Sequence, residues 1–194
     1  MVKVSNVKVY ELKESVIACR NAMRLTPPKY TDEEFEASLP RAIKLANTPM
    51  GSAHGNFLCG IRVAFDIKYP SYFTPELQRY HFNDIVCSSS KMHRLVKMDM
   101  DACFNKYVVT VAKELMKALI NRYNENPTYE NFMLVVSNCP LGVELFMRCT
   151  TNYLQLKTIY HQRKHHKLKE DWVDGFCKDF IEQLPYAKEF ILNE

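Results

Sequence analysis

The side chains best suited to chemistry gather in the segment from Glu76 to Met92, which carries acids, bases, three consecutive serines and a lysine. Cations and hydroxyls of this kind bind phosphate and carbonyl oxygens through charge-assisted hydrogen bonds. The segment follows an expected strand and a proline, and segments between rigid elements commonly carry binding sites. A polar helix followed by a solvated loop is the alternative interpretation, because motif-like clusters also arise by chance.

A second group of candidate residues lies on an expected helix over residues 152–164, for which Thr151 is a suitable N-cap. Asn152 and Arg163 are eleven residues apart, about three helical turns, so both side chains point to the same side. The alternative interpretations are a simple helix cap for Asn152 and a solvated helix end for Arg163.

Hydrophobic periodicity predicts the elements that must position these residues. Apolar residues alternate with polar ones from 61 to 67, which is typical of a strand, and Tyr69-Pro70 should end it. A further strand is expected within residues 2–12, and a short helix over 15–23. Residues 48–55 read as a loop that contains His54.

Helix signals account for much of the remaining chain. Thr31 begins a capping box, so a helix should start near Asp32, and Pro40 should interrupt it. Residues 101–123 predict a helix of about five turns. A short helix is expected over 129–136. Trp172, Phe176 and Phe180 recur every four residues and indicate the core face of a last helix.

Composition fits an ordinary globular protein, with 47% hydrophobic and 25% charged residues, and 194 residues most simply form one domain over 1–194. No apolar run approaches the roughly 18 residues that a membrane span needs, and the first residues lack a signal-peptide pattern. The seven cysteines are scattered without a Cys-x-x-Cys pair, which favours reduced thiols in the cytoplasm and predicts no metal site.

A net charge of +4 suits a small anionic ligand at least as well as nucleic acid. Residues 161–167 are the most basic stretch and could bind nucleic-acid phosphates. Interleaved aromatic residues are missing there, however, and a helix C-terminus favours cations in any case. We therefore expect no nucleic-acid partner and no membrane partner.

The segment 76–92 resembles the signature of the flavin-dependent thymidylate synthases. That signature is Arg-His-Arg, two residues, Ser, one residue, Asn-Glu, one residue, Ser, one residue, Arg-Tyr. Laid on without a gap, Arg79 falls on the first arginine, Ser89 on the second serine and Lys91 on the arginine that follows. His81 falls on the arginine that ends Arg-His-Arg, and Glu76 stands at a glutamine that precedes the signature.

Two further stretches extend the resemblance. His54 stands at a histidine that in the family lies near the flavin. Asn152 and Arg163 reproduce an asparagine and an arginine at the two ends of a family helix. Trp172 follows Arg163 by nine residues, as a tryptophan does in the family.

The resemblance implies an α+β fold, a sheet flanked by helices, in a homotetramer whose active sites lie between subunits. It implies FAD as cofactor, NADPH as reductant, and transfer of a one-carbon unit from methylenetetrahydrofolate to deoxyuridine monophosphate (dUMP). By the same resemblance, FAD would contact four residues: His54, Arg79, His81 and Asn152. The pyrimidine deoxynucleotide monophosphate would contact Glu76, Ser89, Lys91 and Arg163, with Ser89 and Arg163 at the reacting group.

This chain also departs from the family pattern. Lys91 loses the bidentate fork of an arginine, and the charge of His81 depends on pH. Glu76 places a carboxylate where a phosphate would meet repulsion, and residues 132–136 lack an arginine that helps to hold the phosphate in the family. Three readings stay open: a divergent enzyme of this kind, an enzyme that modifies another pyrimidine nucleotide or installs another one-carbon group, and a nucleotide-binding protein without catalysis.

Overall fold

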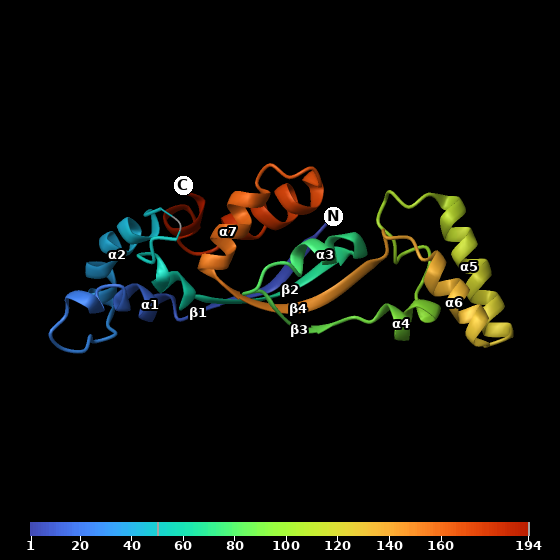
Figure 1. The fold of residues 1–194 in the computed structure, drawn as a ribbon, viewed down its shortest axis with the longest axis horizontal. Helices are drawn as coiled ribbons and strands as arrows, with labels where there is room; N and C mark the ends of the chain where they lie inside the picture. Colours follow the sequence, from blue (N-terminus) through green and yellow to red (C-terminus); the bar gives the residue numbers. More distant parts are fainter. Residues whose placement is uncertain (50, 194) are drawn as a thin grey trace.

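The computed structural model of the protein describes residues 1–49 and 51–193. Within them, one four-stranded antiparallel sheet has the strand order β1-β2-β4-β3 (Figure 1). The strands are β1 Lys3–Tyr10, β2 Arg62–Pro70, β3 Asp84–Ser88 and β4 Glu144–Asn152. Helices pack on this sheet, and the predicted α+β class is confirmed.

The two central strands, β2 and β4, form the longest pairing in the sheet, which runs without interruption from Arg62↔Asn152 to Pro70↔Glu144. The alternation predicted for β2 is present, since Val63, Phe65 and Ile67 are all buried. The strand β4 was not predicted, although its buried residues alternate with more exposed ones such as Phe146. The strand β3 was not predicted either, because all of its residues are exposed and it therefore has no alternating pattern of burial.

The longer helices are α1 Leu12–Ala18, α2 Asp32–Ala46, α5 Thr110–Glu125, α6 Tyr129–Asn138 and α7 Tyr153–Arg163, with one-turn helices α3 Thr74–Leu77 and α4 Lys91–Arg94. Two π-helices are η5 Lys169–Lys178 and η7 Lys188–Leu192. Short 3₁₀ turns are η1 Asn21–Met23, η2 Asn56–Cys59, η3 Ser71–Phe73, η4 Leu95–Lys97 and η6 Ile181–Gln183. No helix among the described residues has the length and hydropathy to cross a membrane.

The predicted start of α2 is confirmed, because the Thr31 hydroxyl accepts a hydrogen bond from the amide of Glu34 at 3.3 Å. The predicted break at Pro40 is wrong, since α2 runs through it. Proline removes one backbone donor, and burial of Phe35, Ser38 and Ala42 on this helix offsets that cost.

Three other helix predictions can be compared with the structure. The helix expected from residue 101 begins only at Thr110, because the preceding backbone hydrogen-bonds across to the β4 side, as from Asn105 N to Gly142 O at 2.9 Å. The helix expected from 129 is confirmed. The predicted N-cap Thr151 is wrong: it belongs to β4, and Asn152 caps α7 instead.

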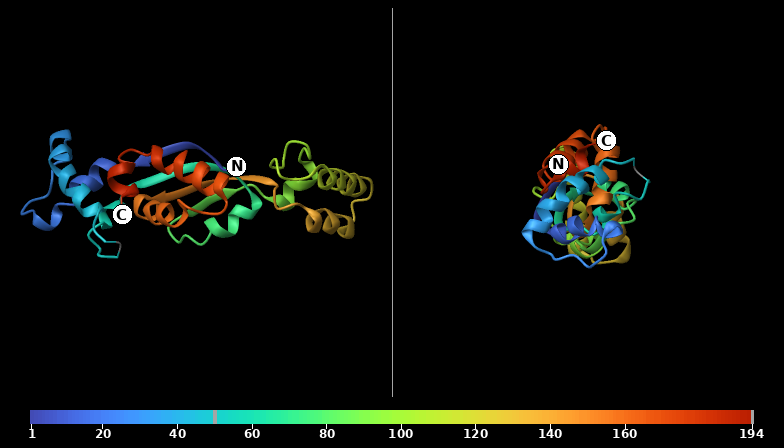
Figure 2. Two further views of the ribbon diagram at one scale, coloured as in Figure 1. Left: turned by 90° about the horizontal axis from the view of Figure 1, so that it is seen from above. Right: turned by 90° about the vertical axis from the view of Figure 1, so that its left-hand side faces the viewer.

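The sheet has one covered and one open face. Helices α3, α7 and η5 lie over the covered face, and the main hydrophobic core fills the space between (Figure 1). On η5 the rings of Trp172 and Phe176 are 5.3 Å apart in that core, as predicted for this helix, although it is a π-helix. A second cluster of buried residues lies with α5 and α6 at one end of the elongated molecule (Figure 2).

Candidate functional site

Arg163, the last residue of α7, lies in a cluster with Glu76, Tyr80 and Trp172, which we call the Arg163 cluster. Its Nε donates to the Tyr80 hydroxyl at 2.8 Å, and its Nη1 lies 3.3 Å from Oε2 of Glu76. The guanidinium also lies over the Trp172 ring, 4.7 Å from the ring centroid. Only 15% of the Arg163 side chain is exposed, so the protein fixes the plane of this cation.

Buried packing holds each member of the cluster. Helix α7 presents Leu156 and Ile159 to the core on the side that Arg163 continues. The Trp172 ring packs at 4.2 Å, between centroids, on Phe73, which directly precedes α3. The position of Arg163 therefore follows from how three elements, α3, α7 and η5, pack on the covered face.

The carboxylate of Glu76 is the electrostatic centre of the cluster. It accepts a hydrogen bond from Nε1 of Trp172, and His166 Nε2 lies 3.6 Å from the same oxygen that meets Arg163. Burial raises the pKa of Tyr80, while the Arg163 guanidinium opposes that rise. The Nη2 atom of Arg163 has no partner among the described residues, so one edge of the guanidinium is available to a ligand.

A second group surrounds a hollow of about 480 Å³, which we call the serine hollow. The Ser89 hydroxyl accepts from the amide of Phe146 at 3.0 Å, which leaves its own proton free to donate. The guanidinium of Arg94 lies 5.1 Å from the centroid of the Phe146 ring. The lining residues come from β2, β3, β4, the two serines between β3 and α4, and the end of α4: Asp66, Cys87, Ser88, Ser89, Ser90, His93, Arg94, Phe146, Met147 and Arg148.

The two groups lie on opposite faces of the sheet. In the register, Asp66 and Cys87 both pair with Arg148, so these three side chains point to the open face, which carries the serine hollow. The Arg163 cluster belongs to the helices of the covered face (Figure 1). Among the residues predicted to bind the nucleotide, Glu76 and Arg163 therefore lie together on the covered face. Ser89 lines the serine hollow on the open face, and Lys91 follows it two residues later.

The predicted flavin residues converge in part on the first turn of α7. Asn152 caps this helix, its Oδ1 accepting from the amide of Gln155 at 2.9 Å. The loop between α3 and β3, which exposes Arg79 and His81, is tied to the same turn by a bond from Phe82 N to Gln155 Oε1 at 3.3 Å. His54 is exposed on the neighbouring loop, for which the structure describes residues 48–49 and 51–55; Met50 of the predicted loop lies outside the described residues. Several residues of this loop line a small pocket together with Leu154 and Lys157 of α7.

Sequence reasoning missed several residues that now belong to these groups. Arg94 and Arg148 became candidates only through the pairing of β4, which was not predicted. Lys157 was overlooked because it falls on the buried side of α7, where a lysine is unexpected. Among the described residues, no three His, Cys, Asp or Glu side chains gather as metal ligands would.

No family model and no curated protein matches the sequence. Solved structures do match the fold. The flavin-dependent thymidylate synthase ThyX from Helicobacter pylori, complexed with FAD and dUMP, is similar at a TM-score of 0.73, 16% identity and 97% of both chains. A second structure of that enzyme is similar at a TM-score of 0.71 and 15% identity, over 98% of this chain and 97% of that one.

A UMP/dUMP methylase, PolB from Streptomyces cacaoi, bound with 5-Br dUMP, is similar at a TM-score of 0.56 and 13% identity, over 86% of this chain and 79% of that one. The coverage of 97% of both chains in the first match identifies the architecture. This chain has the fold of the flavin-dependent thymidylate synthases.

Proposed function

We propose that this protein is a flavin-dependent enzyme of pyrimidine nucleotide metabolism that transfers a one-carbon unit to a nucleotide of the dUMP type. The observation that carries the proposal is the fold match over 97% of both chains with an enzyme complexed with FAD and dUMP. A fold alone does not specify function, so the proposal also depends on what the Arg163 cluster and the serine hollow offer a nucleotide.

The pyrimidine base would meet Arg163. Its guanidinium is held in plane by Tyr80 and Glu76, and the available Nη2 edge can donate to a base carbonyl. A fixed cation at that oxygen stabilises negative charge that develops on it when the ring is attacked, because the donor needs no reorganisation. Arg163 would therefore both orient the base and activate it.

The phosphate would meet the serine hollow. Ser89 offers a free hydroxyl proton there, and Arg94 and Arg148 supply positive charge. Lys91, at the first turn of α4, would add a further cation. Such contacts are the strong, charge-assisted kind. Ser89 would also hold the nucleotide at the reacting position, as the resemblance implies.

Because the two groups lie on opposite faces, a single nucleotide reaches both only if the serine hollow of one copy meets the Arg163 cluster of another. We therefore propose a homo-oligomer, a homotetramer as the resemblance implies, with composite sites between copies. The open sheet face supplies a surface for it, since β3 is exposed along its whole length and Phe146 is 54% exposed.

FAD would lie near the first turn of α7. The exposed side chains of His54, Arg79 and His81 can donate to it, and the Nδ2 of Asn152 has no partner among the described residues. The bound flavin would supply the electron transfer that side chains lack. NADPH and methylenetetrahydrofolate would serve as co-substrates, and the seven free cysteines fit a cytoplasmic location.

One observation favours a second candidate, modification of another pyrimidine nucleotide. The Glu76 carboxylate lies beside the guanidinium, and an acceptor there suits the amino group of cytosine better than a second carbonyl. The third reading, a binding protein without catalysis, shares the fold but lacks turnover.

The test is turnover with FAD, NADPH and methylenetetrahydrofolate, using dUMP, UMP and deoxycytidine monophosphate (dCMP) in parallel and mass spectrometry of the nucleotides. A methylated product from dUMP supports the proposal, and a product from dCMP alone supports the second candidate. Nucleotide binding without any product from the FAD-loaded protein contradicts both enzymatic readings.

A further inference from the structure

Lys157 is a buried cation on α7 that has no carboxylate partner in the part of the chain that the structure describes. The residue is 2% exposed, although lysine is almost never fully buried unless it is paired. None of the ion pairs among the described residues includes it. Burial lowers the pKa of Lys157, as expected for an ammonium group taken out of water.

One role for this side chain is evident. Its Nζ donates to the carbonyl of Ala46 at 2.6 Å, and Ala46 is the last residue of α2. A cation at a helix C-terminus satisfies an unpaired carbonyl and suits the helix dipole. An ammonium group has three donors, however, and Ala46 accepts only one of them. The other two have no acceptor among the described residues.

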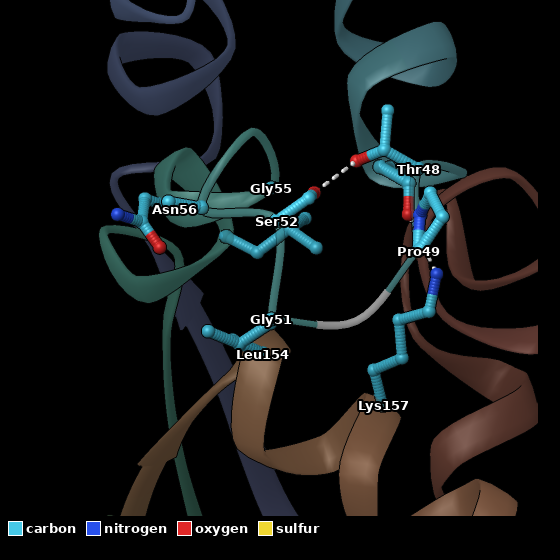
Figure 3. Close-up of a pocket in the computed structure, with 11 residues that line it drawn as sticks. Thr48, Pro49, Gly51, Ser52, Gly55, Asn56, Leu154 and Lys157 are labelled. Carbon is cyan, nitrogen blue, oxygen red and sulfur yellow. Dashed lines mark hydrogen bonds between the residues drawn. The ribbon is translucent and has the colours of Figure 1, made fainter.

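The same side chain lines a pocket between the first two turns of α7 and residues 48–49 and 51–56 (Figure 3). Its volume is about 180 Å³. That is several times the ~30 Å³ of one water molecule in the liquid, and below the roughly 300 Å³ at which ordinary ligand sites begin. The pocket therefore has the size of a small polyatomic ion rather than of a whole nucleotide.

The pocket wall is made largely of backbone and small side chains. Gly51 adopts a φ of +89°, and a Cβ there would meet nothing within 4 Å. Ser52 donates its hydroxyl to Thr48 at 3.2 Å across the mouth of the pocket (Figure 3). The Thr48 hydroxyl in turn donates to the carbonyl of Leu45 at 2.7 Å, so both hydroxyl protons are already used. Lys157 extends from α7 toward the end of α2, and a guest would take its hydrogen bonds from this ammonium group rather than from the hydroxyls.

We infer that this pocket binds an oxyanion of the phosphate class, with Lys157 as its counter-charge. Such an ion would supply acceptors for the two unused N–H groups and would neutralise a charge that is otherwise buried alone. The ion could be free phosphate or diphosphate, or the phosphate group of a bound nucleotide or flavin. The inference goes beyond the proposed function, because it holds whether or not the protein catalyses a reaction.

The test is the melting temperature of the wild-type protein in inorganic phosphate and in inorganic diphosphate, against sodium chloride at the same ionic strength. We expect a rise with the oxyanions that is lost in Lys157→Gln. Lys178→Gln is the matched control, because it removes an equal charge from an exposed ion pair with Asp174. Equal rises in wild type and Lys157→Gln, or no rise in wild type, would overturn the inference.

Since Lys157→Gln also removes the contact with Ala46, a second variant guards against a folding defect. Ser52→Phe fills the mouth of the pocket and leaves Lys157 and Ala46 unchanged. It should melt near the wild-type temperature in chloride and should gain nothing from phosphate. A phosphate response as large as that of the wild type would count against the pocket as the site.

A comparison of FAD with riboflavin, which has no phosphate, shows whether the bound phosphate group belongs to FAD or is a free ion. If the pocket holds a phosphate of FAD, Lys157→Gln should reduce stabilisation by FAD but not by riboflavin, and diphosphate should compete with FAD. If it holds a free ion, the rises from FAD and diphosphate should add. Should FAD fail to bind at all, the inorganic ions still decide the inference, separately from the proposed function.

Discussion

Arg163 and Glu76 form an ion pair that joins the end of α7 to α3, with Nη1 and Oε2 3.3 Å apart and the two side chains only 15% and 29% exposed. The pair explains how Arg163 is held, but it also places a negative charge where an anionic nucleotide would approach. Nucleotide affinity and base preference should therefore depend on Glu76.

Glu76→Gln should strengthen dUMP binding and weaken dCMP binding. The amide oxygen of glutamine can still accept from Trp172, whereas the negative charge near the ligand is lost. We expect the difference between the two binding free energies to change by about 0.5–1.5 kcal/mol, the net contribution of one hydrogen bond. Calorimetry with both nucleotides measures the difference, and an unchanged difference would show that Glu76 does not face the base.

Arg163→Lys should weaken nucleotide binding by about 1.5–3 kcal/mol, the range for a hydrogen bond to a charged group. Lysine keeps the charge but cannot donate to Tyr80, Glu76 and a base edge in one plane. Calorimetry with dUMP, dCMP and dTMP gives the affinities, and Arg122→Lys on the exposed side of α5 is the matched control. Affinities equal to wild type would remove the assignment, and a mutant that merely unfolds would make Arg163 a structural residue.

The sequence predicted the parts of the fold that carry their own periodic pattern. The central strand β2 and the start of α2 were read correctly, because burial alternates in the one and a cap opens the other. The helix α7 was also predicted, although its cap was placed one residue early. Of the two residues predicted at its ends, Asn152 caps the helix and Arg163 belongs to the Arg163 cluster.

Other parts depend on contacts that no local pattern records. The edge strand β3 is exposed throughout, so it has no apolar face to detect, and Pro40 sits in a helix that tertiary burial maintains. The positions of Arg94 and Arg148 at the serine hollow follow from the register of β3 and β4, which local sequence does not fix. The same limit hid the separation of Ser89 from Arg163 on opposite faces.

Cys87 offers a probe of the proposed oligomer, because it lies on β3 beside the serine hollow and is exposed in the single chain. If copies pack on the open sheet face, iodoacetamide should modify Cys87 slowly in concentrated protein and faster on dilution. Cys59, which is exposed at η2, is the internal control and should react independently of concentration. Mass spectrometry of the peptides gives both rates, and light scattering gives the mass.

A rate for Cys87 that does not change with dilution, together with a monomer by light scattering, would contradict the oligomer and the composite site. The buried Cys177 should stay unmodified in either case, since burial raises its pKa to about 12 and shields its sulfur. Its modification would signal unfolding, so it checks that the native protein is being probed.

Lys157 should make the free energy of unfolding depend on pH in the alkaline range. Its pKa is lower in the folded than in the unfolded chain, so between those two values the unfolded state binds more protons. The contribution of Lys157 to the free energy of unfolding must then rise as the pH increases between these two pKa values, by at most about 1.4 kcal/mol per pH unit. The increment should be absent in Lys157→Met.

The measurement is urea unfolding of both proteins from neutral to alkaline pH. Other groups titrate in this range, since burial raises the pKa of Cys103 and Cys149 to about 11, so the difference between the two proteins isolates Lys157. A difference in unfolding free energy that stays flat with pH would mean that Lys157 is not buried as a charged group.

The central claim is that this fold binds a flavin for chemistry on a pyrimidine nucleotide, and retention of FAD tests it most directly. Purified protein is saturated with FAD, freed of unbound cofactor by gel filtration, and examined by visible absorption with and without dUMP. The account predicts a flavin spectrum that elutes with the protein and is perturbed by dUMP, with both effects weakened in Asn152→Ala. Protein that elutes colourless after saturation with FAD would contradict it.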